Sequence, residues 1–291
     1  MGCAVSTPCK VNLHLGIHAE KDGRGYHRVD SVMVPVGLFD DVEVEEAPAL
    51  EVVHEPALGV PPERTTVWKA ASLLAEALGV EPRARIRVKA RIPEKAGLGG
   101  SSADAGAALR CLAELWGFEA TDPRVVEVAR KTGADVAFFL DPVPSLCLGA
   151  GDVLERTFDE VELPVVLAMP AGDGVSTKEC YDEFDRMGEE PASFEGVCAA
   201  LEAGDVEGLT GLLYNNLAAA AKRLNPAVAE VEEWVSGQPE VIAAQVTGSG
   251  SCTFGVCATL EDARAVARRA QDERNWWSFA TLTVGDSAKV C

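Results

Sequence analysis

The sequence contains no uninterrupted apolar run that approaches the ~20 residues needed to cross a bilayer. Its first residues, MGCAVSTPCKVNLHL, also lack the long apolar segment behind basic residues that marks a secretory signal. We therefore expect a cytoplasmic protein with no membrane partner.

Basic residues are scarce, because 26 Lys and Arg stand against 46 Asp and Glu, and the formal net charge is −20. An electrostatic field of this sign repels polyanions, which argues against a nucleic-acid partner. Any phosphate-bearing ligand must therefore be held by local dipoles and a few cations, against the charge of the whole molecule.

Metal ligands of the His and Cys type are few or badly spaced. The chain has four histidines, and its nine cysteines are odd in number and form no Cys-x-x-Cys pair. This pattern predicts the reduced thiols of a cytosolic protein rather than a disulfide framework or a zinc site. The cysteines are Cys3, Cys9, Cys111, Cys147, Cys180, Cys198, Cys252, Cys257 and Cys291.

Apolar material for a core is ample, since 47% of the 291 residues are hydrophobic and 25% are charged. At ~150 residues per domain, this length suggests about two domains. The proline-bounded segment Pro164–Pro170 is the candidate boundary, and we expect domains at residues 1–160 and 161–291. Strand-like and helix-like periodicities occur in both parts, so the predicted fold class is α+β.

The hydrophobic pattern and the turn residues predict individual elements. Strands are expected at 3–17, 32–38, 41–46, 86–92, 145–148, 160–169, 241–246, 252–258 and 277–284. Helices are expected at 66–78, 102–116, 123–132, 177–187, 193–203, 206–213, 226–236 and 261–271.

The segment Pro93–Asp104, PEKAGLGGSSAD, joins a predicted strand to a helix of small residues. Its glycines let several backbone N–H groups point inward, and the helix N-terminus adds about half a positive charge. Ser101 and Ser102 can cap the helix and offer hydroxyls to phosphate oxygens or to Mg²⁺, the only metal contact we expect. We predict a phosphate site made of Pro93, Gly97, Leu98, Gly99, Gly100, Ser101 and Ser102.

Three competing motifs do not fit this segment. A Walker loop needs Gly-Lys-Ser/Thr, but Ser101 follows the glycines directly. A dinucleotide fingerprint beginning at Gly97 would need glycine in place of Ser102, and a Gly-x-Ser-x-Gly elbow would need glycine in place of Ala103. A glycine-rich turn before a capped helix, with no ligand, stays open as an alternative.

Two charged residues adjoin apolar runs. Asp135 precedes VAFFL and will be partly desolvated unless a cation or hydrogen bonds hold it, although it could also cap a short helix. Lys10 and Asn12 leave the same face of the first predicted strand. Lys10 could therefore be the cation that keeps Asp135 ionised, and a solvated strand face is the alternative.

Two further segments could bind a ligand or could have a purely structural role. Tyr26 and His27 follow a glycine turn, where an aromatic ring beside an imidazole could hold a planar base or could simply lie on a surface loop. The segment TGSGSC contains Gly248, Ser249 and Gly250 between two predicted strands. It is either a tight hairpin or a cover over phosphates.

Together these segments resemble the GHMP kinase superfamily, in the expected order and over nearly the whole chain. PEKAGLGGSSAD and TGSGSC resemble motifs that the superfamily shares, whereas GYHRVDSV and TGADVAFFL resemble its branch acting on a cytidine-diphosphate-linked alcohol. The chain departs from that branch where Ala103 separates the serines from Asp104, at Thr65-Thr66 in place of a common Asn, and at Ala137 in place of a proline.

The resemblance implies a two-domain fold, with an N-terminal mixed-sheet domain, a ferredoxin-like C-terminal domain and the active site between them. It implies ATP with Mg²⁺ as co-substrate, no tightly bound cofactor, and phosphorylation of the 2-hydroxyl of 4-diphosphocytidyl-2-C-methyl-D-erythritol in the non-mevalonate isoprenoid pathway. We expect a monomer or weak homodimer. The alternatives are a homoserine- or mevalonate-type kinase, and a non-catalytic nucleotide-binding regulator.

The resemblance also implies roles for individual residues. Asp135 would accept the proton of the substrate hydroxyl, and Lys10 would keep Asp135 ionised. Asn12 would face the acceptor alcohol. Tyr26 and His27 would recognise the cytosine of the substrate, with Tyr181 stacking from the other side.

Overall fold

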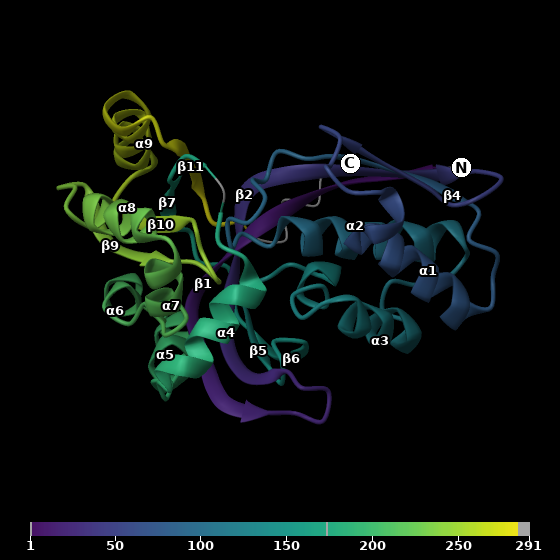
Figure 1. Ribbon diagram of the computed structural model, residues 1–291, viewed down its shortest axis with the longest axis horizontal. Helices are drawn as coiled ribbons and strands as arrows, with labels where there is room; N and C mark the ends of the chain where they lie inside the picture. Colours follow the sequence, from purple (N-terminus) through teal and green to yellow (C-terminus); the bar gives the residue numbers. More distant parts are fainter. Residues whose placement is uncertain (1, 173, 285–291) are drawn as a thin grey trace.

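Two β-sheets organise the chain in the computed structural model, which describes residues 2–172 and 174–284 (Figure 1). Within these residues, sheet A has seven strands: β1 (Gly2–Lys21), β2 (His27–Glu46), β3 (Glu51–Glu55), β4 (Ala84–Lys89), β5 (Ser145–Leu148), β6 (Val153–Thr157) and β8 (Tyr214–Asn215). Sheet B has four: β7 (Pro164–Met169), β9 (Val241–Val246), β10 (Thr253–Cys257) and β11 (Trp277–Leu282). The two sheets are built almost entirely from different halves of the sequence.

Sheet A is mixed. Its main strand order is β3-β4-β2-β1-β8, with β5 joined to β2 and β6 joined to β5. The β3–β4 and β1–β8 pairs are parallel, and the other pairs are antiparallel. Three helices lie together along one side of the long strands: α1 (Thr66–Leu78), α2 (Gly100–Leu115) and α3 (Pro123–Thr132) (Figure 1).

Sheet B is antiparallel, with the order β11-β7-β10-β9. It is packed against α8 (Pro226–Ser236) and α9 (Leu260–Arg274). This strand order with helices against the sheet is the ferredoxin-like arrangement, so the α+β architecture expected from the sequence is confirmed. Between β7 and α8 lie α4 (Thr177–Met187), α5 (Glu195–Ala203), α6 (Val206–Thr210) and α7 (Ala218–Leu224).

The domain limits expected from the sequence stay a prediction. The strands of sheet B all lie after residue 163, which agrees with a division near residue 160. However, β8, at residues 214–215, pairs with β1 in sheet A, so the second half of the chain also contributes to the first sheet.

The prediction of two separate strands at 32–38 and 41–46 was wrong, because both belong to the single strand β2. The pairing of β2 with β1 shifts where Cys9 faces Val36 and Pro8 faces Phe39, which leaves Gly37 and Leu38 as extra residues. Such a bulge bends a strand and breaks its alternation without ending it. The apparent gap in the hydrophobic pattern is therefore this irregularity.

Several other boundaries differ. Strands β3, β6 and β8 and helix α7 were not predicted, the strand expected at 160–169 begins at Pro164, and the helix expected at 206–213 ends at Thr210. β3 and β6 are five residues each, and β6 is largely exposed. α7 contains the alanine run at 218–221, whose uniform composition has no amphipathic period.

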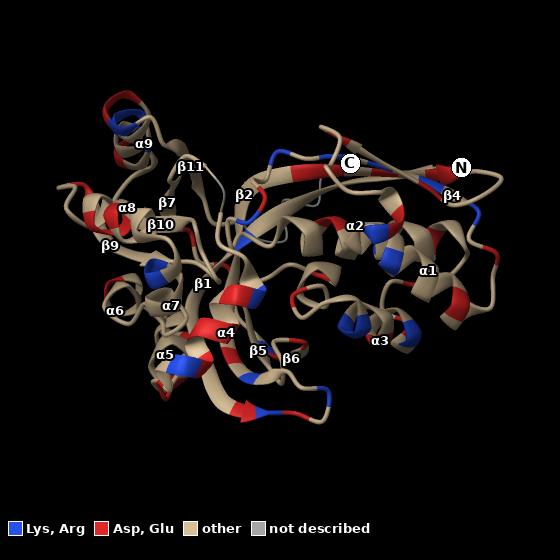
Figure 2. Cartoon of the chain, viewed as in Figure 1, with Lys and Arg blue, Asp and Glu red and all other residues tan. Residues whose placement is uncertain are grey.

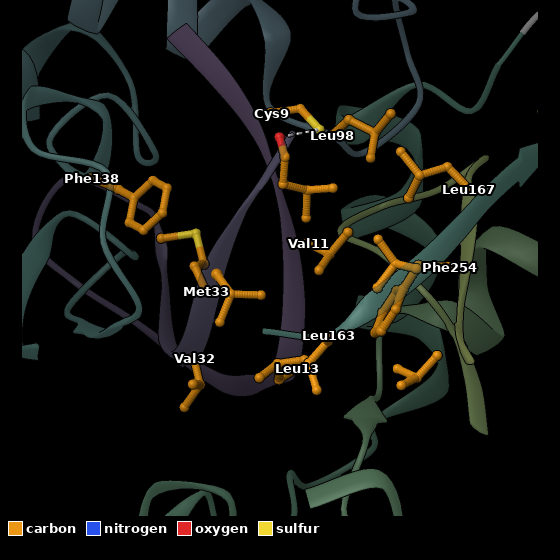
Figure 3. Close-up of a cluster of buried hydrophobic side chains, with 14 of the residues drawn as sticks. Cys9, Val11, Leu13, Val32, Met33, Leu98, Phe138, Leu163, Leu167 and Phe254 are labelled. Atoms are coloured by element: carbon orange, nitrogen blue, oxygen red, sulfur yellow. Dashed lines mark hydrogen bonds between the residues drawn. The ribbon is translucent and has the colours of Figure 1, made fainter. Parts of the chain in front are cut away.

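One hydrophobic cluster joins the two sheets (Figure 3). Cys9, Val11 and Leu13 of β1 face Leu167 of β7 and Phe254 of β10, and all five are buried. Leu98, from the predicted phosphate segment, belongs to the same cluster. The hydrophobic core between sheets A and B therefore also supports this segment.

Acidic residues occur on strands of sheet A and on helices α8 and α9, which pack against sheet B, in keeping with the net charge of −20 (Figure 2). Within residues 2–172 and 174–284, no helix has the length and apolarity that a membrane span requires.

The prediction of reduced thiols throughout was wrong for one pair, because Cys3 of β1 and Cys111 of α2 form a disulfide. The two cysteines are 108 residues apart and come together only because α2 packs on β1, which no sequence spacing reveals. Cys9, Cys147, Cys180, Cys198, Cys252 and Cys257 are free and buried. Cys291 lies outside the described residues.

Removing this disulfide is expected to lower the free energy of unfolding by about 2–4 kcal/mol, because a bridge that closes a long loop restricts the unfolded chain. Urea unfolding of Cys3→Ser, and of the parent protein with and without a thiol reductant, measures the effect. The reductant should not change the stability of Cys3→Ser. Equal parent stability under both conditions would show that the bridge contributes nothing.

Candidate active site

A cavity of about 850 Å³ opens between the phosphate segment, the β1–β2 hairpin and α4. All the residues predicted for the site line this cavity except Gly250. They are Lys10, Asn12, Tyr26, His27, Pro93, Gly97, Leu98, Gly99, Gly100, Ser101, Ser102, Asp135, Tyr181, Gly248 and Ser249. The fold thus brings together segments that are far apart in the sequence.

The phosphate loop, residues 93–102, is held by backbone hydrogen bonds on two sides. The N–H of Lys10 on β1 donates to the carbonyl of Leu98 at 3.0 Å. The N–H groups of Ser251 and Cys252 donate to the carbonyls of Lys95 and Ala96, each at 3.1 Å. The loop therefore lies between strand β1 and the third glycine motif, residues 247–252.

Gly97 packs closely against the third glycine motif. Its φ is +74°, and a Cβ at this position would lie 2.1 Å from the carbonyl oxygen of Thr247. Both the backbone conformation and the contact therefore require glycine.

Gly97→Ala is expected to destabilise the protein by about 2–4 kcal/mol, the sum of left-handed strain and overpacking. Gly79→Ala is the matched control, because Gly79 has φ +70° but open space around the added Cβ. The control should lose only about 1–2 kcal/mol, the strain alone. Chemical denaturation of both variants tests this, and equal losses would contradict the close packing.

Helix α2 begins at Gly100, directly after the loop, with Gly99 as its N-cap at φ +79°. No side chain caps the helix, so the expectation that Ser101 or Ser102 would do so was wrong. Both serines lie within the first turn instead and line the cavity. The N–H groups of Ser102 and Ala103 donate to the carbonyl of Gly99 at 3.0 Å and 2.8 Å, so the N–H groups of Gly100 and Ser101, with the helix dipole, favour an anion here.

The lysine and the aspartate predicted to form a pair meet in the cavity. Lys10 Nζ lies 3.6 Å from Asp135 Oδ2, and the two side chains are 4% and 31% exposed. Asp135 follows α3 in a turn, where the backbone of Val136 hydrogen bonds back to Gly133. A buried ammonium ion beside a partly exposed carboxylate leaves the carboxylate accessible to a ligand.

Asn12 connects Lys10 with the third glycine motif. Its Oδ1 accepts hydrogen bonds from Lys10 Nζ at 2.6 Å and from Thr247 Oγ1 and the Gly248 N–H, each at 3.0 Å. Its Nδ2 donates to Ser31 Oγ at 2.9 Å. The amide therefore orients Lys10, and one of its N–H bonds remains for a ligand.

Cys147 lies near the lysine–aspartate pair but does not act as a base. Burial, followed by the nearby charge of Asp135, raises the pKa of the Cys147 thiol to about 12. The thiol is therefore protonated at neutral pH.

Aromatic side chains line the far end of the cavity. Tyr26 is 58% exposed at the hairpin turn, and the ring of Tyr181 on α4 lies 5.4 Å from that of His27. His27 Nδ1 donates to the carbonyl of His18 at 2.7 Å, and its Nε2 lies 3.0 Å from Asp185 Oδ1. Burial raises the pKa of the Tyr181 hydroxyl beyond its usual range, so the ring presents a neutral surface.

The sequence analysis missed several residues that shape the site. Thr247 Oγ1 donates a hydrogen bond to Asn12 Oδ1. Asp185 forms an ion pair with Lys21 at 2.7 Å and also contacts His27. Asp40 and Asp104 line the cavity next to the phosphate loop. Thr247 was within a quoted motif and could have been singled out. The partners of the three aspartates depend on packing between distant segments, for which the sequence has no signal.

The cavity lining includes five cations, Lys10, Lys21, Arg64, Lys95 and Lys178. Three of them, Lys10, Lys21 and Lys178, are paired with Asp135, Asp185 and Asp182. Within the described part of the chain, no group of three or more His, Cys, Asp or Glu side chains is placed to hold a metal ion.

A helix terminus that favours an anion shares one cavity with an ion-paired aspartate, an arrangement suited to phosphoryl transfer between two small molecules. Models of the GHMP kinase N-terminal and C-terminal domains match residues 65–141 and 198–274. The chain belongs to the GHMP kinase family and is an ATP-dependent small-molecule kinase.

Two relatives of this chain carry the same name. The 4-diphosphocytidyl-2-C-methyl-D-erythritol kinase of Pelotomaculum thermopropionicum is 36% identical over 89% of this chain and 91% of its own. The kinase of the same name from Mycobacterium tuberculosis is 36% identical over 89% of this chain and 83% of its own. A crystal structure of 4-(cytidine 5'-diphospho)-2C-methyl-D-erythritol kinase superposes with a TM-score of 0.78 at 29% identity, covering 97% of this chain and 100% of that one.

More distant structures share the fold. A homoserine kinase from Cytophaga hutchinsonii has a TM-score of 0.72 at 18% identity, covering 98% of this chain and 95% of its own.

Proposed function

We propose that this kinase transfers the γ-phosphoryl group of ATP to the 2-hydroxyl of 4-diphosphocytidyl-2-C-methyl-D-erythritol, a step in isoprenoid precursor synthesis. One observation carries the proposal: a single cavity joins the phosphate loop, the Lys10–Asp135 pair and an aromatic end formed by Tyr26, His27 and Tyr181. Relatives named for this substrate cover most of the chain.

Asp135 is the general base in this proposal. Its carboxylate accepts the proton of the substrate hydroxyl as the oxygen attacks the γ-phosphorus, which breaks the bond to ADP. Lys10, oriented by Asn12, keeps Asp135 ionised and stabilises the negative charge of the transferring group. The loop backbone and the first turn of α2 hold the β- and γ-phosphates.

The aromatic end of the cavity binds the cytosine. Tyr26 and Tyr181 offer ring faces, and the buried His27 Nε2, which lies 3.0 Å from Asp185 Oδ1, offers a polar group beside them. The acceptor alcohol then lies between the cytosine and the phosphate loop, next to Asp135 and Asn12.

Magnesium accompanies ATP in this proposal. The cavity offers the hydroxyls of Ser101 and Ser102, and oxygen ligands of this kind suit Mg²⁺, which usually keeps several waters and binds substrate phosphates. When bound, the ion neutralises charge on the phosphates. No tightly held cofactor is needed.

The cellular location, the domain limits and the oligomeric state are parts of the same proposal. An enzyme that consumes ATP and a soluble nucleotide-linked alcohol works in the cytoplasm. We divide it into domains at residues 1–160 and 161–291, and we propose a monomer or weak homodimer without a nucleic-acid or membrane partner.

A coupled assay of ADP release over a panel of alcohols tests the proposal. Turnover is expected with the cytidine-diphosphate-linked methylerythritol, and not with homoserine, mevalonate or the methylerythritol phosphate that lacks cytidine. Cytidine diphosphate alone should also raise the melting temperature, because a ligand at 100 times its Kd stabilises by about 2.7 kcal/mol. Turnover with homoserine or mevalonate alone would reject the proposal.

A further inference from the structure

Two buried carboxyl groups lie beneath the phosphate loop, outside the machinery described above. Asp40 on β2 is 1% exposed and Asp104 on α2 is 6% exposed, and both adjoin the cavity. The two carboxyl groups are close enough for each to act on the pKa of the other. The Oδ1 atom of Asp104 is buried and has no partner in the structure.

Asp40 is also bound to the segment that leads into the loop. Its Oδ1 accepts hydrogen bonds from the backbone N–H of Arg91 at 2.5 Å and of Ile92 at 2.8 Å. A Cβ on Gly100 would lie 3.8 Å from Asp40 Oδ2, so this second oxygen lies beside the first residue of α2. The Asp40–Asp104 contact therefore links the start of the loop with the helix that ends it.

A hydrogen bond between two carboxyl groups requires a proton on one of them, because two buried carboxylates in contact repel each other strongly. Burial raises the pKa of Asp40 as well, but two N–H donors favour its charged form, whereas the buried Oδ1 of Asp104 has no donor in the structure. Burial, followed by the charge of Asp40, raises the pKa of Asp104 well above its usual range. The proton therefore resides on Asp104.

We propose that Asp104 is the protonated member of the pair and donates a hydrogen bond to Asp40, and that this acid–carboxylate bond positions the phosphate loop for the nucleotide. Asp104 is a positioning residue in this account, because it acts through the loop and α2. Its use in nucleotide binding rests on the proposed function, whereas its protonation does not.

The charged groups around the pair leave this proton in place. Arg91 is the cation that acts on Asp40, but its guanidinium is paired with Asp41 at 2.6 Å. Cys9 of β1 also faces Asp40, and burial raises the pKa of its thiol to about 12, so it adds no charge at neutral pH. Loss of the proton at alkaline pH would leave two adjacent negative charges under the ATP phosphates.

The sign of the effect on stability follows from the raised pKa. A protonated Asp104 contributes fully below its unfolded pKa, and the contribution is lost as pH rises through its folded pKa. ATP affinity is expected to fall over the same alkaline range, because the added charge repels the phosphates.

The test compares the parent protein with Asp104→Asn, whose amide can donate the same hydrogen bond but cannot lose a proton. The dissociation constant for ATP, measured calorimetrically without any alcohol, should rise about tenfold more in the parent than in Asp104→Asn as the pH is raised from neutral into the alkaline range. Other groups titrate in both proteins, so the difference belongs to Asp104. Asp40→Asn should flatten the profile in the same way, and Asp159→Asn, an exposed control, should keep the parent profile.

Infrared spectroscopy gives a readout that does not depend on nucleotide binding. The carbonyl band of a protonated carboxylic acid should be present in the parent at neutral pH and absent from Asp104→Asn. Its absence from the parent, or identical pH profiles for ATP in the parent and Asp104→Asn, would overturn the proposal. If ATP bound to neither protein, the proposed kinase function would fail, and the infrared band would still decide the state of Asp104.

Discussion

Asp135→Asn is expected to lower kcat by ~10²–10⁴, the usual contribution of a positioned general base. Asparagine keeps the size of the side chain but cannot take the proton of the substrate hydroxyl. The loop that holds ATP does not include Asp135, so the dissociation constant for ATP should change little. Single-turnover phosphoryl transfer and calorimetric ATP binding, measured on the same preparation, separate the two effects.

The control for this substitution is Asp272→Asn, an exposed position on α9 away from the cavity. It makes the same change of charge and should leave kcat unaltered. Normal turnover by Asp135→Asn would remove the aspartate from the mechanism. A parallel loss of ATP binding would show that Asp135 serves the nucleotide site instead.

Lys10→Met should lower kcat by ~10²–10³, the cost of removing one fixed donor from the developing charge. Methionine retains the apolar stem, which packs where a Cβ on Gly99 would lie 3.1 Å from Lys10 Cγ. Asn12 Oδ1 would keep its bonds to Thr247 and Gly248. The melting temperature should therefore change little, although kcat falls.

Lys89→Met is the matched control, because Lys89 forms a surface ion pair with Glu43 at 2.7 Å and lies on β4. It should alter neither kcat nor the KM for ATP. Unchanged turnover in Lys10→Met would contradict the role of the lysine, whatever its effect on stability.

Local patterns predicted much of the fold. Helices 66–78, 177–187 and 226–236 have the expected limits, because each has a capping residue at its start and a clear amphipathic face. The position of the phosphate loop before α2 followed from its glycines and serines. The pairing of Lys10 with Asp135 was suggested by a charged residue beside an apolar run in each segment, and the resemblance to a known family supported it, since nothing local links residues 125 positions apart.

Tertiary packing accounts for what the sequence did not predict. The bulge at Gly37 and Leu38 is defined by the register with β1, the disulfide of Cys3 by the packing of α2, and the Asp40–Asp104 contact by the approach of β2 to that helix. Each depends on two segments that meet only in the folded chain. The sequence of one chain alone carries no signal for such contacts.

A crystal structure of the protein with a non-hydrolysable ATP analogue and the cytidine-diphosphate-linked methylerythritol tests the central claim most directly. We expect the 2-hydroxyl oxygen about 3 Å from an Asp135 carboxylate oxygen, with Lys10 Nζ against the γ-phosphate and the phosphates on the first turn of α2. An acceptor hydroxyl turned away from Asp135, or phosphates bound away from α2, would contradict the account.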